Sequence, residues 1–168
     1  MQWVISDSST LIHLAKIDRL NLLQNLYERI TVPPAVWHEV VEQGAGRPGV
    51  VELIEARQNG WVQMVEPGDK PLVRLLERDL DEGEAEVIAL AVEKQAELIL
   101  LDETEARRIA DLYSITKSGV IGVLIKAKQK GLISNLREDL KRLREDAGFW
   151  IEDKLYKQAL KAVGETDN

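Results

Sequence analysis

The sequence predicts a single three-layer α/β domain in which a mainly parallel sheet is flanked by helices. Short apolar runs, bounded by glycine, proline or polar turn residues, alternate along the chain with segments of helical periodicity. The connections between them are short, and the chain contains no internal repeat and no linker. We therefore expect one domain over residues 1–168, with C-terminal helices from about residue 134.

The strands are expected where apolar and β-branched residues form short runs. The first run leads straight into Asp7, and the fourth, which is fully apolar, leads straight into Asp102. In chain order the expected strands cover residues 3–9, 29–32, 61–65, 98–101 and 114–116. Both aspartates would thus stand at the carboxyl end of a strand, where open α/β sheets place their ligands.

The helices are expected where apolar residues recur every three or four positions. Ser8 or Ser9 can cap the first helix with its hydroxyl, and Pro34 is tolerated in the first turn of the third. Gly131 ends the eighth helix. The expected helices cover residues 10–17, 19–27, 35–43, 50–58, 72–78, 84–95, 104–112, 118–130, 136–144 and 153–163.

Composition narrows the classes of function. The 168 residues include 22 Lys and Arg against 29 Asp and Glu, a net charge of −7, which suits a cation site or a basic partner better than general nucleic-acid binding. The absence of cysteine excludes disulfides, thiolate zinc sites and thiol nucleophiles. We recognise no leader peptide and no apolar run long enough to span a membrane, so a cytoplasmic protein is expected.

Four carboxylates stand at element ends or in early helical turns, namely Asp7, Glu39, Glu84 and Asp102. Successive residues of an α-helix are rotated by about 100°. On the helix over residues 84–95, this rotation places Glu84 inside the apolar stripe, whereas Glu86 projects from the opposite face.

Glu39 lies at the border of the apolar face of its helix, while His38 and Glu42 point away. Because an unpaired buried carboxylate is costly, Glu39 and Glu84 should have cations or hydrogen-bond donors nearby. The alternative for Asp7 is that it only caps the first helix.

A cluster of oxygen ligands suits Mg²⁺ or Mn²⁺. Such an ion lowers the pKa of a bound water and neutralises charge on a displaced oxygen, which implies metal-assisted phosphodiester hydrolysis. Without metal the carboxylates would repel one another, and the pKa of at least one should be raised.

These acidic motifs resemble, in the same order, those of PIN domains, the α/β ribonuclease domains familiar in VapC-type toxins. The matching stretches are Asp7-Ser8-Ser9, Val32-Pro33-Pro34 with Glu39, residues 83–91, and Leu101-Asp102-Glu103. Residues 118–124, 126–128 and 131–133 resemble an uncharacterised prokaryotic PIN-like branch. The similarity extends from about residue 4 to residue 162.

The resemblance implies a Mg²⁺ or Mn²⁺ cofactor, an RNA substrate, a homodimer and a small antitoxin protein that blocks the site. Asp7, Glu39, Glu84 and Asp102 would be the catalytic metal ligands, with Glu103 as a further ligand. The sequence departs from the family motif at Glu84 and Glu103, where aspartate is usual. These two departures bear on whether the site is catalytically competent.

Other polar residues are candidate substrate contacts. Arg107 and Arg108 follow Asp102 closely enough to hold a phosphate, and Ser9 and Ser118 lie in or near the motifs. We assign His13 and His38 to structural roles, because neither has a second histidine at ligand spacing. The four tryptophans are scattered, which favours core or interface packing over base stacking, and the basic late helices are interpreted as solvated faces.

Two rival functions remain open. A binding module of the same fold would use its acidic cluster to engage a basic partner. A phosphatase-type enzyme would need an acid two residues after a nucleophilic Asp7, and Ser9 stands there instead.

Overall fold

Within residues 2–165, which the computed structural model describes, five strands form one parallel sheet in the order β3-β2-β1-β4-β5. This architecture confirms the α/β prediction. The strands are β1 (Val4–Ser6), β2 (Ile30–Val32), β3 (Val62–Met64), β4 (Leu98–Leu100) and β5 (Lys117–Ser118). The ends of the predicted 1–168 domain, residue 1 and residues 166–168, lie outside the described residues.

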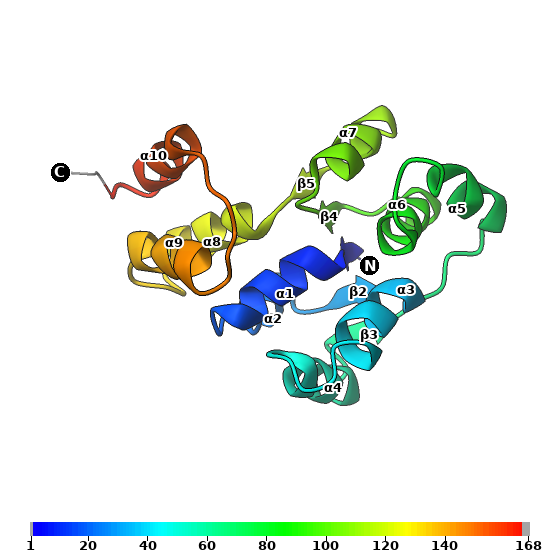
Figure 1. Cartoon of the computed structure of the whole chain (residues 1–168), viewed down its shortest axis with the longest axis horizontal. Helices are drawn as coiled ribbons and strands as arrows, with labels where there is room; N and C mark the ends of the chain where they lie inside the picture. The colour runs from blue at the N-terminus through cyan, green and yellow to red at the C-terminus, as the bar shows by residue number, and fades with distance from the viewer. Residues whose placement is uncertain (1, 166–168) are drawn as a thin grey trace.

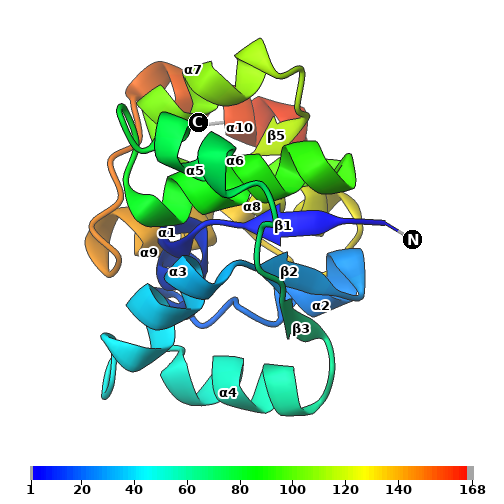
Figure 2. The same ribbon diagram turned by 90° about the vertical axis from the view of Figure 1, so that its right-hand side faces the viewer.

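The helices cover both faces of the sheet, so that the fold has three layers. Figure 1 shows α1, α2, α8 and α9 on one side and α5, α6 and α7 on the other. Figure 2, seen from the second side, shows α6 next to β1 and α4 next to β3. The helices are α1 (Ser8–Lys16), α2 (Leu22–Tyr27), α3 (Pro34–Trp37), η1 (His38–Glu42), α4 (Val50–Gln58), α5 (Lys70–Leu76), α6 (Glu82–Lys94), α7 (Thr104–Leu112), α8 (Val120–Gln129), α9 (Leu136–Glu145) and α10 (Asp153–Ala162).

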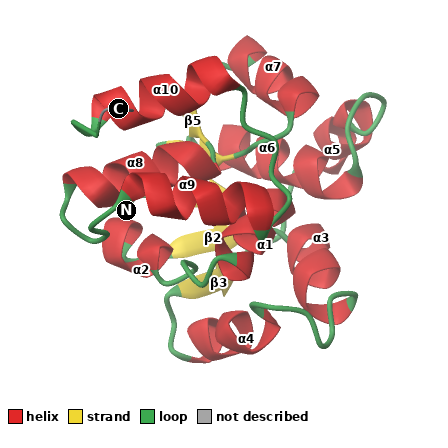
Figure 3. Ribbon diagram, turned by 60° about the vertical axis from the view of Figure 1, so that its left-hand side comes forward, coloured by secondary structure: helices red, strands yellow, loops and turns green. Residues whose placement is uncertain are grey.

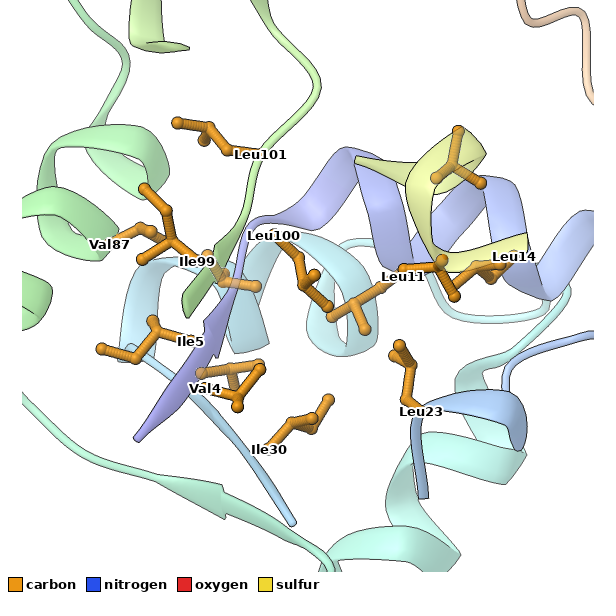
Figure 4. Close-up of a cluster of buried hydrophobic side chains, with 14 of the residues drawn as sticks. Val4, Ile5, Leu11, Leu14, Leu23, Ile30, Val87, Ile99, Leu100 and Leu101 are labelled. Carbon is orange, nitrogen blue, oxygen red and sulfur yellow. The ribbon is translucent and has the colours of Figure 1, made fainter. Parts of the chain in front are cut away.

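The core surrounds the central strand β1 and its neighbour β2. Every residue of β1 and β2 is buried, as expected for parallel strands covered on both faces. Figure 4 shows the apolar side chains that meet there from β1, β2, β4, α1, α2 and α6. This packing fixes the backbone at the ends of β1 and β4.

Several predicted elements differ from the structure at their ends, since Ser8 and Ser9 belong to α1 and not to the first strand, and two elements differ further. The fifth strand lies at Lys117–Ser118 instead of residues 114–116, because Ser114 has φ +56° and belongs to the turn that ends α7. The helix expected over residues 35–43 is an α-helical turn, α3, followed by the π-helix η1. A π-helix has a different angular spacing, so 100° per residue does not describe the direction of Glu39.

The C-terminal helices pack over α8, and α9 is also tied to the first half of the chain. Asp139 of α9 is only 2% exposed and accepts hydrogen bonds from Arg19 Nε (3.1 Å) and Nη2 (3.2 Å). This ion pair, in which Asp139 is buried and Arg19 is half-buried, anchors α9 beside the end of α1. Among the described residues, every helix is too short or too polar to cross a bilayer.

Candidate functional site

The sheet order changes direction between β1 and β4, and the carboxyl ends of these strands carry Asp7 and Asp102. Such a switch point is where open α/β sheets bind ligands. Asp7 is 3% exposed, and its Oδ1 accepts a hydrogen bond from Thr10 N at 2.8 Å. Asp7 is therefore the N-cap of α1, in place of the predicted Ser8 or Ser9, and its Oδ2 accepts a hydrogen bond from Asp102 N at 3.2 Å.

Asp102 is held by two donors from two different helices. Its Oδ2 accepts a hydrogen bond from Thr10 Oγ1 at 2.8 Å, and Val120 N lies 3.1 Å from each carboxylate oxygen. Gly119 permits this arrangement, because a Cβ there would lie 2.2 Å from Asp102 Oδ1. The first residue of α8 and the first turn of α1 thus orient the Asp102 carboxylate.

Glu39 reaches the site from η1. Its Oε2 accepts a hydrogen bond from Ser8 Oγ at 3.0 Å, which is the donor that the sequence argument required. The residue is exposed, whereas the neighbouring His38 and Glu42 pair with each other on the outer face of η1.

Glu84 enters the site from the first turn of α6, where Asp81 is the N-cap and accepts a hydrogen bond from Glu84 N at 2.8 Å. The sequence argument did not select Asp81 as a site residue. A signal was present, because an aspartate three residues before Glu84, at the start of a helical pattern, is a typical N-cap.

These side chains line one pocket with a volume of about 360 Å³. Six of the eleven lining residues are carboxylic acids. The lining consists of Asp7, Ser8, Ser9, Ile12, His13, Glu39, Asp81, Glu84, Asp102, Glu103 and Phe149. We call it the acid pocket.

Burial and mutual repulsion make ionisation of the acid pocket costly. Burial, with a smaller contribution from the Asp102 charge, raises the pKa of Asp7 to about 7 despite the hydrogen bonds from Thr10. Burial, a hydrogen bond with the Asp81 carboxylate and the charges of Asp81, Glu103 and Asp7 raise the pKa of Glu84 to about 8. Burial also raises the pKa of Asp102, although the donors from Thr10 and Val120 oppose this shift.

His13 and Phe149 are further lining residues that the sequence argument missed. His13, assigned a purely structural role, is half-buried in the acid pocket, and its Nδ1 shares a 3.2 Å hydrogen bond with Ser9 Oγ. The Phe149 ring meets the His13 ring edge to face, with centroids 4.9 Å apart. Burial lowers the pKa of His13, although the Asp102 charge opposes this shift.

The remaining candidate residues lie at different distances from the pocket. Glu103 lines it and caps α7, since its Oε2 accepts a hydrogen bond from Ala106 N at 2.9 Å. Arg107 is half-buried beside Asp102 and donates to Leu101 O at 2.7 Å. Arg108 is exposed and pairs with Glu105 on the surface of α7. Ser118 lies in β5 beside Gly122 and does not belong to the pocket lining.

The prediction for Glu86 is wrong, because this residue is 7% exposed instead of projecting into solvent. Its Oε2 accepts a hydrogen bond from Ala35 N at 2.8 Å, in the first turn of α3. Burial raises the pKa of Glu86. Helix α6 is buried on nearly all sides over residues 85–91, so its second face is covered by other helices instead of water.

Comparison with known families settles the membership of the chain. Residues 3–165 match the family DUF3368: PIN domain. The chain belongs to this PIN domain family. Neither the curated proteins nor the solved structures gave a significant match. PIN domains are in general metal-dependent nucleases, and the acid pocket of this PIN domain lies at the sheet edge where a ligand is expected.

The donor chemistry of the acid pocket fits a hard divalent cation, because its acidic side chains offer only oxygen ligands. Among the described residues, no three carboxylate or imidazole side chains are already placed to hold one metal ion. Mg²⁺ commonly takes only one or two carboxylates and completes its shell with water and substrate phosphate. Asp7 and Asp102, adjacent at the switch point, meet that smaller requirement.

Proposed function

We propose that this PIN domain is a Mg²⁺- or Mn²⁺-dependent endoribonuclease that hydrolyses RNA phosphodiester bonds. The observation that carries the proposal is the buried Asp7 carboxylate beside Asp102 in a pocket lined by six acids. Their charges are costly in the free protein, and a divalent cation would offset that cost. A bound cation supplies an activated water and neutralises charge on the phosphodiester.

The acidic residues of the pocket would have different roles according to their positions. Asp7 and Asp102 are the proposed metal ligands on rigid strand ends, and Glu39 and Glu84 complete the acidic surroundings from two helices. Glu103 is a further proposed ligand at the N-terminus of α7.

Three neighbouring groups would orient the ligands and the substrate. Thr10 holds Asp7 and Asp102 in register, because its backbone N–H donates to one and its hydroxyl to the other. Ser9 lines the pocket and is a proposed contact to RNA. Arg107 is half-buried beside Asp102, so its proposed role is to orient this part of the site and not to bind a phosphate.

The biological setting that we propose is a cytoplasmic toxin of a toxin–antitoxin pair. Membership of the PIN family supports this setting. We further propose a homodimer and a small antitoxin that closes the acid pocket, for which a basic segment would be complementary to the six acids.

Cleavage of a mixed RNA pool with and without Mn²⁺ tests the proposed activity. The wild type should cleave only with the ion, and Asp102→Asn should lose activity by orders of magnitude while its melting curve stays cooperative. Asp69→Asn is a matched control, because Asp69 is an exposed N-cap on α5 outside the pocket. Wild-type protein that binds a basic peptide but never cleaves RNA would instead identify a binding module.

A further inference from the structure

The connection between α9 and α10 presents an aromatic side chain to solvent. Trp150 is 84% exposed, the largest exposed fraction among the large apolar side chains of the described residues. Of the two kinds of packing expected for the tryptophans, a place in the core does not apply to Trp150. Figure 3 shows the loop crossing from the end of α9 to the start of α10.

The backbone on both sides of Trp150 is fixed. Phe149 N donates to Leu143 O at 3.0 Å, and Ile151 is 2% exposed. Arg144 Nη2 donates to Ile151 O at 2.7 Å. Trp150 is therefore held outward by an anchored loop, which lowers the entropy lost when a ligand binds to it.

The loop is continuous with the acid pocket through Phe149. This residue lines the acid pocket, where it contacts His13, and also lines a second hollow of about 400 Å³. The second hollow is formed by Arg144, Gly148, Phe149, Trp150, Ile151 and Asp153. Phe149 is thus shared by the acid pocket and by the hollow that Trp150 lines.

We propose that Phe149 and Trp150 form a stacking subsite for a nucleobase of single-stranded RNA next to the bond that is cleaved. Aromatic faces bind bases of any sequence, and an exposed ring beside a catalytic pocket provides such a face. The Arg144 guanidinium in the same hollow lies over the Tyr156 ring, 4.4 Å from its centroid, and pairs with Asp153 at 3.4 Å, so the subsite depends on the aromatic faces and not on a free positive charge. This subsite rests on the proposed ribonuclease function and adds the residues that would hold one unpaired base beside the cleaved bond.

The test compares Trp150→Ala and Trp150→Phe with the wild type in Mn²⁺-dependent cleavage of a short single-stranded RNA. Leu112→Ala is the matched control, because Leu112 is 73% exposed at the end of α7 and lines neither hollow. The alanine variant should raise KM about tenfold with little change in kcat, whereas the phenylalanine and control variants should stay near the wild type. A tenfold change corresponds to about 1.4 kcal/mol, which is in the range for one stacked base.

A series of substrates with one abasic nucleotide at successive positions provides a readout that a merely structural role would not move. At one position the missing base should lower kcat/KM about tenfold for the wild type. The same substrate should lower kcat/KM very little for Trp150→Ala, because the two changes remove the same contact. The Mn²⁺-induced rise in melting temperature should be equal in both proteins.

Three outcomes would overturn the subsite. If the wild type is active and Trp150→Ala cleaves RNA with the same KM, the stacking subsite is refuted and the proposed ribonuclease function is not. An unchanged KM combined with a smaller mass by light scattering would assign Trp150 to an interface between copies of the chain. If the wild-type protein cleaves no RNA, the proposed function and the subsite are both refuted.

Discussion

The substitution Asp7→Asn should stabilise the metal-free protein at pH 8 and fail to do so at pH 5. The reason is that burial raises the pKa of Asp7 from 3.8 to about 7. The folded state therefore binds a proton more tightly than the unfolded chain, so stability is highest below about pH 4 and falls as the pH rises towards 7. Above pH 7 the full free-energy cost of the ionised Asp7 carboxylate lowers the stability of the folded state.

The magnitude follows from the shift and from the hydrogen bonds of Asp7. Each pH unit of pKa difference corresponds to about 1.4 kcal/mol, so the ionised group costs about 4 kcal/mol at pH 8. Asparagine keeps one oxygen to cap Thr10 N but places an amide against Asp102 N–H, which costs about 1–3 kcal/mol. The expected net gain at pH 8 is about 1–3 kcal/mol, and at pH 5 the variant should be equal to the wild type or less stable.

Urea unfolding in EDTA at the two pH values measures this difference. The Asp69→Asn variant is the control, because it replaces another N-cap aspartate on an exposed surface and should change stability little at either pH. If Asp7→Asn is destabilised equally at pH 5 and pH 8, the reasoning from burial of Asp7 is refuted.

Three further outcomes are expected from thermal melting. Mn²⁺ at 100 times its Kd should stabilise the wild type by about 2.7 kcal/mol, a rise in Tm of about 5–10 °C, and overlaid curves in Mn²⁺ and EDTA would contradict a cation site. Gly119→Ala should displace Asp102, cost about 1–3 kcal/mol and abolish that rise, whereas Gly83→Ala, whose Cβ has 3.5 Å of space, should keep it. Glu84→Gln should weaken the rise much more than Glu86→Gln, and equal effects would contradict the assignment of Glu84 to the pocket.

The parts of the site that follow strands could be predicted from the sequence. Asp7 and Asp102 end apolar runs, and parallel pairing of two such runs brings their ends to one edge of the sheet. The order of the strands was not needed for this prediction. Glu39 and Glu84, which helical spacing and the family resemblance both selected, have positions that depend on helix packing.

The errors arose where long-range packing overrides local periodicity. Glu86 was placed in solvent because one apolar stripe explained α6, but a second helix layer covers its other face and supplies the Ala35 N–H. The sequence predicts a structural role for His13, because Phe149, its partner in the pocket, is distant in the sequence. The direction of Glu39 depends on the π-helix η1, which residue spacing does not reveal.

The most direct test of the central claim, that the acid pocket holds a divalent cation, is the anomalous scattering of Mn²⁺ in crystals of the wild type. The claim predicts a peak bonded to carboxylate oxygens of Asp7 and Asp102, absent from crystals of Asp102→Asn grown under the same conditions. A well-occupied Mn²⁺ elsewhere on the chain, with none between these two aspartates, would contradict it.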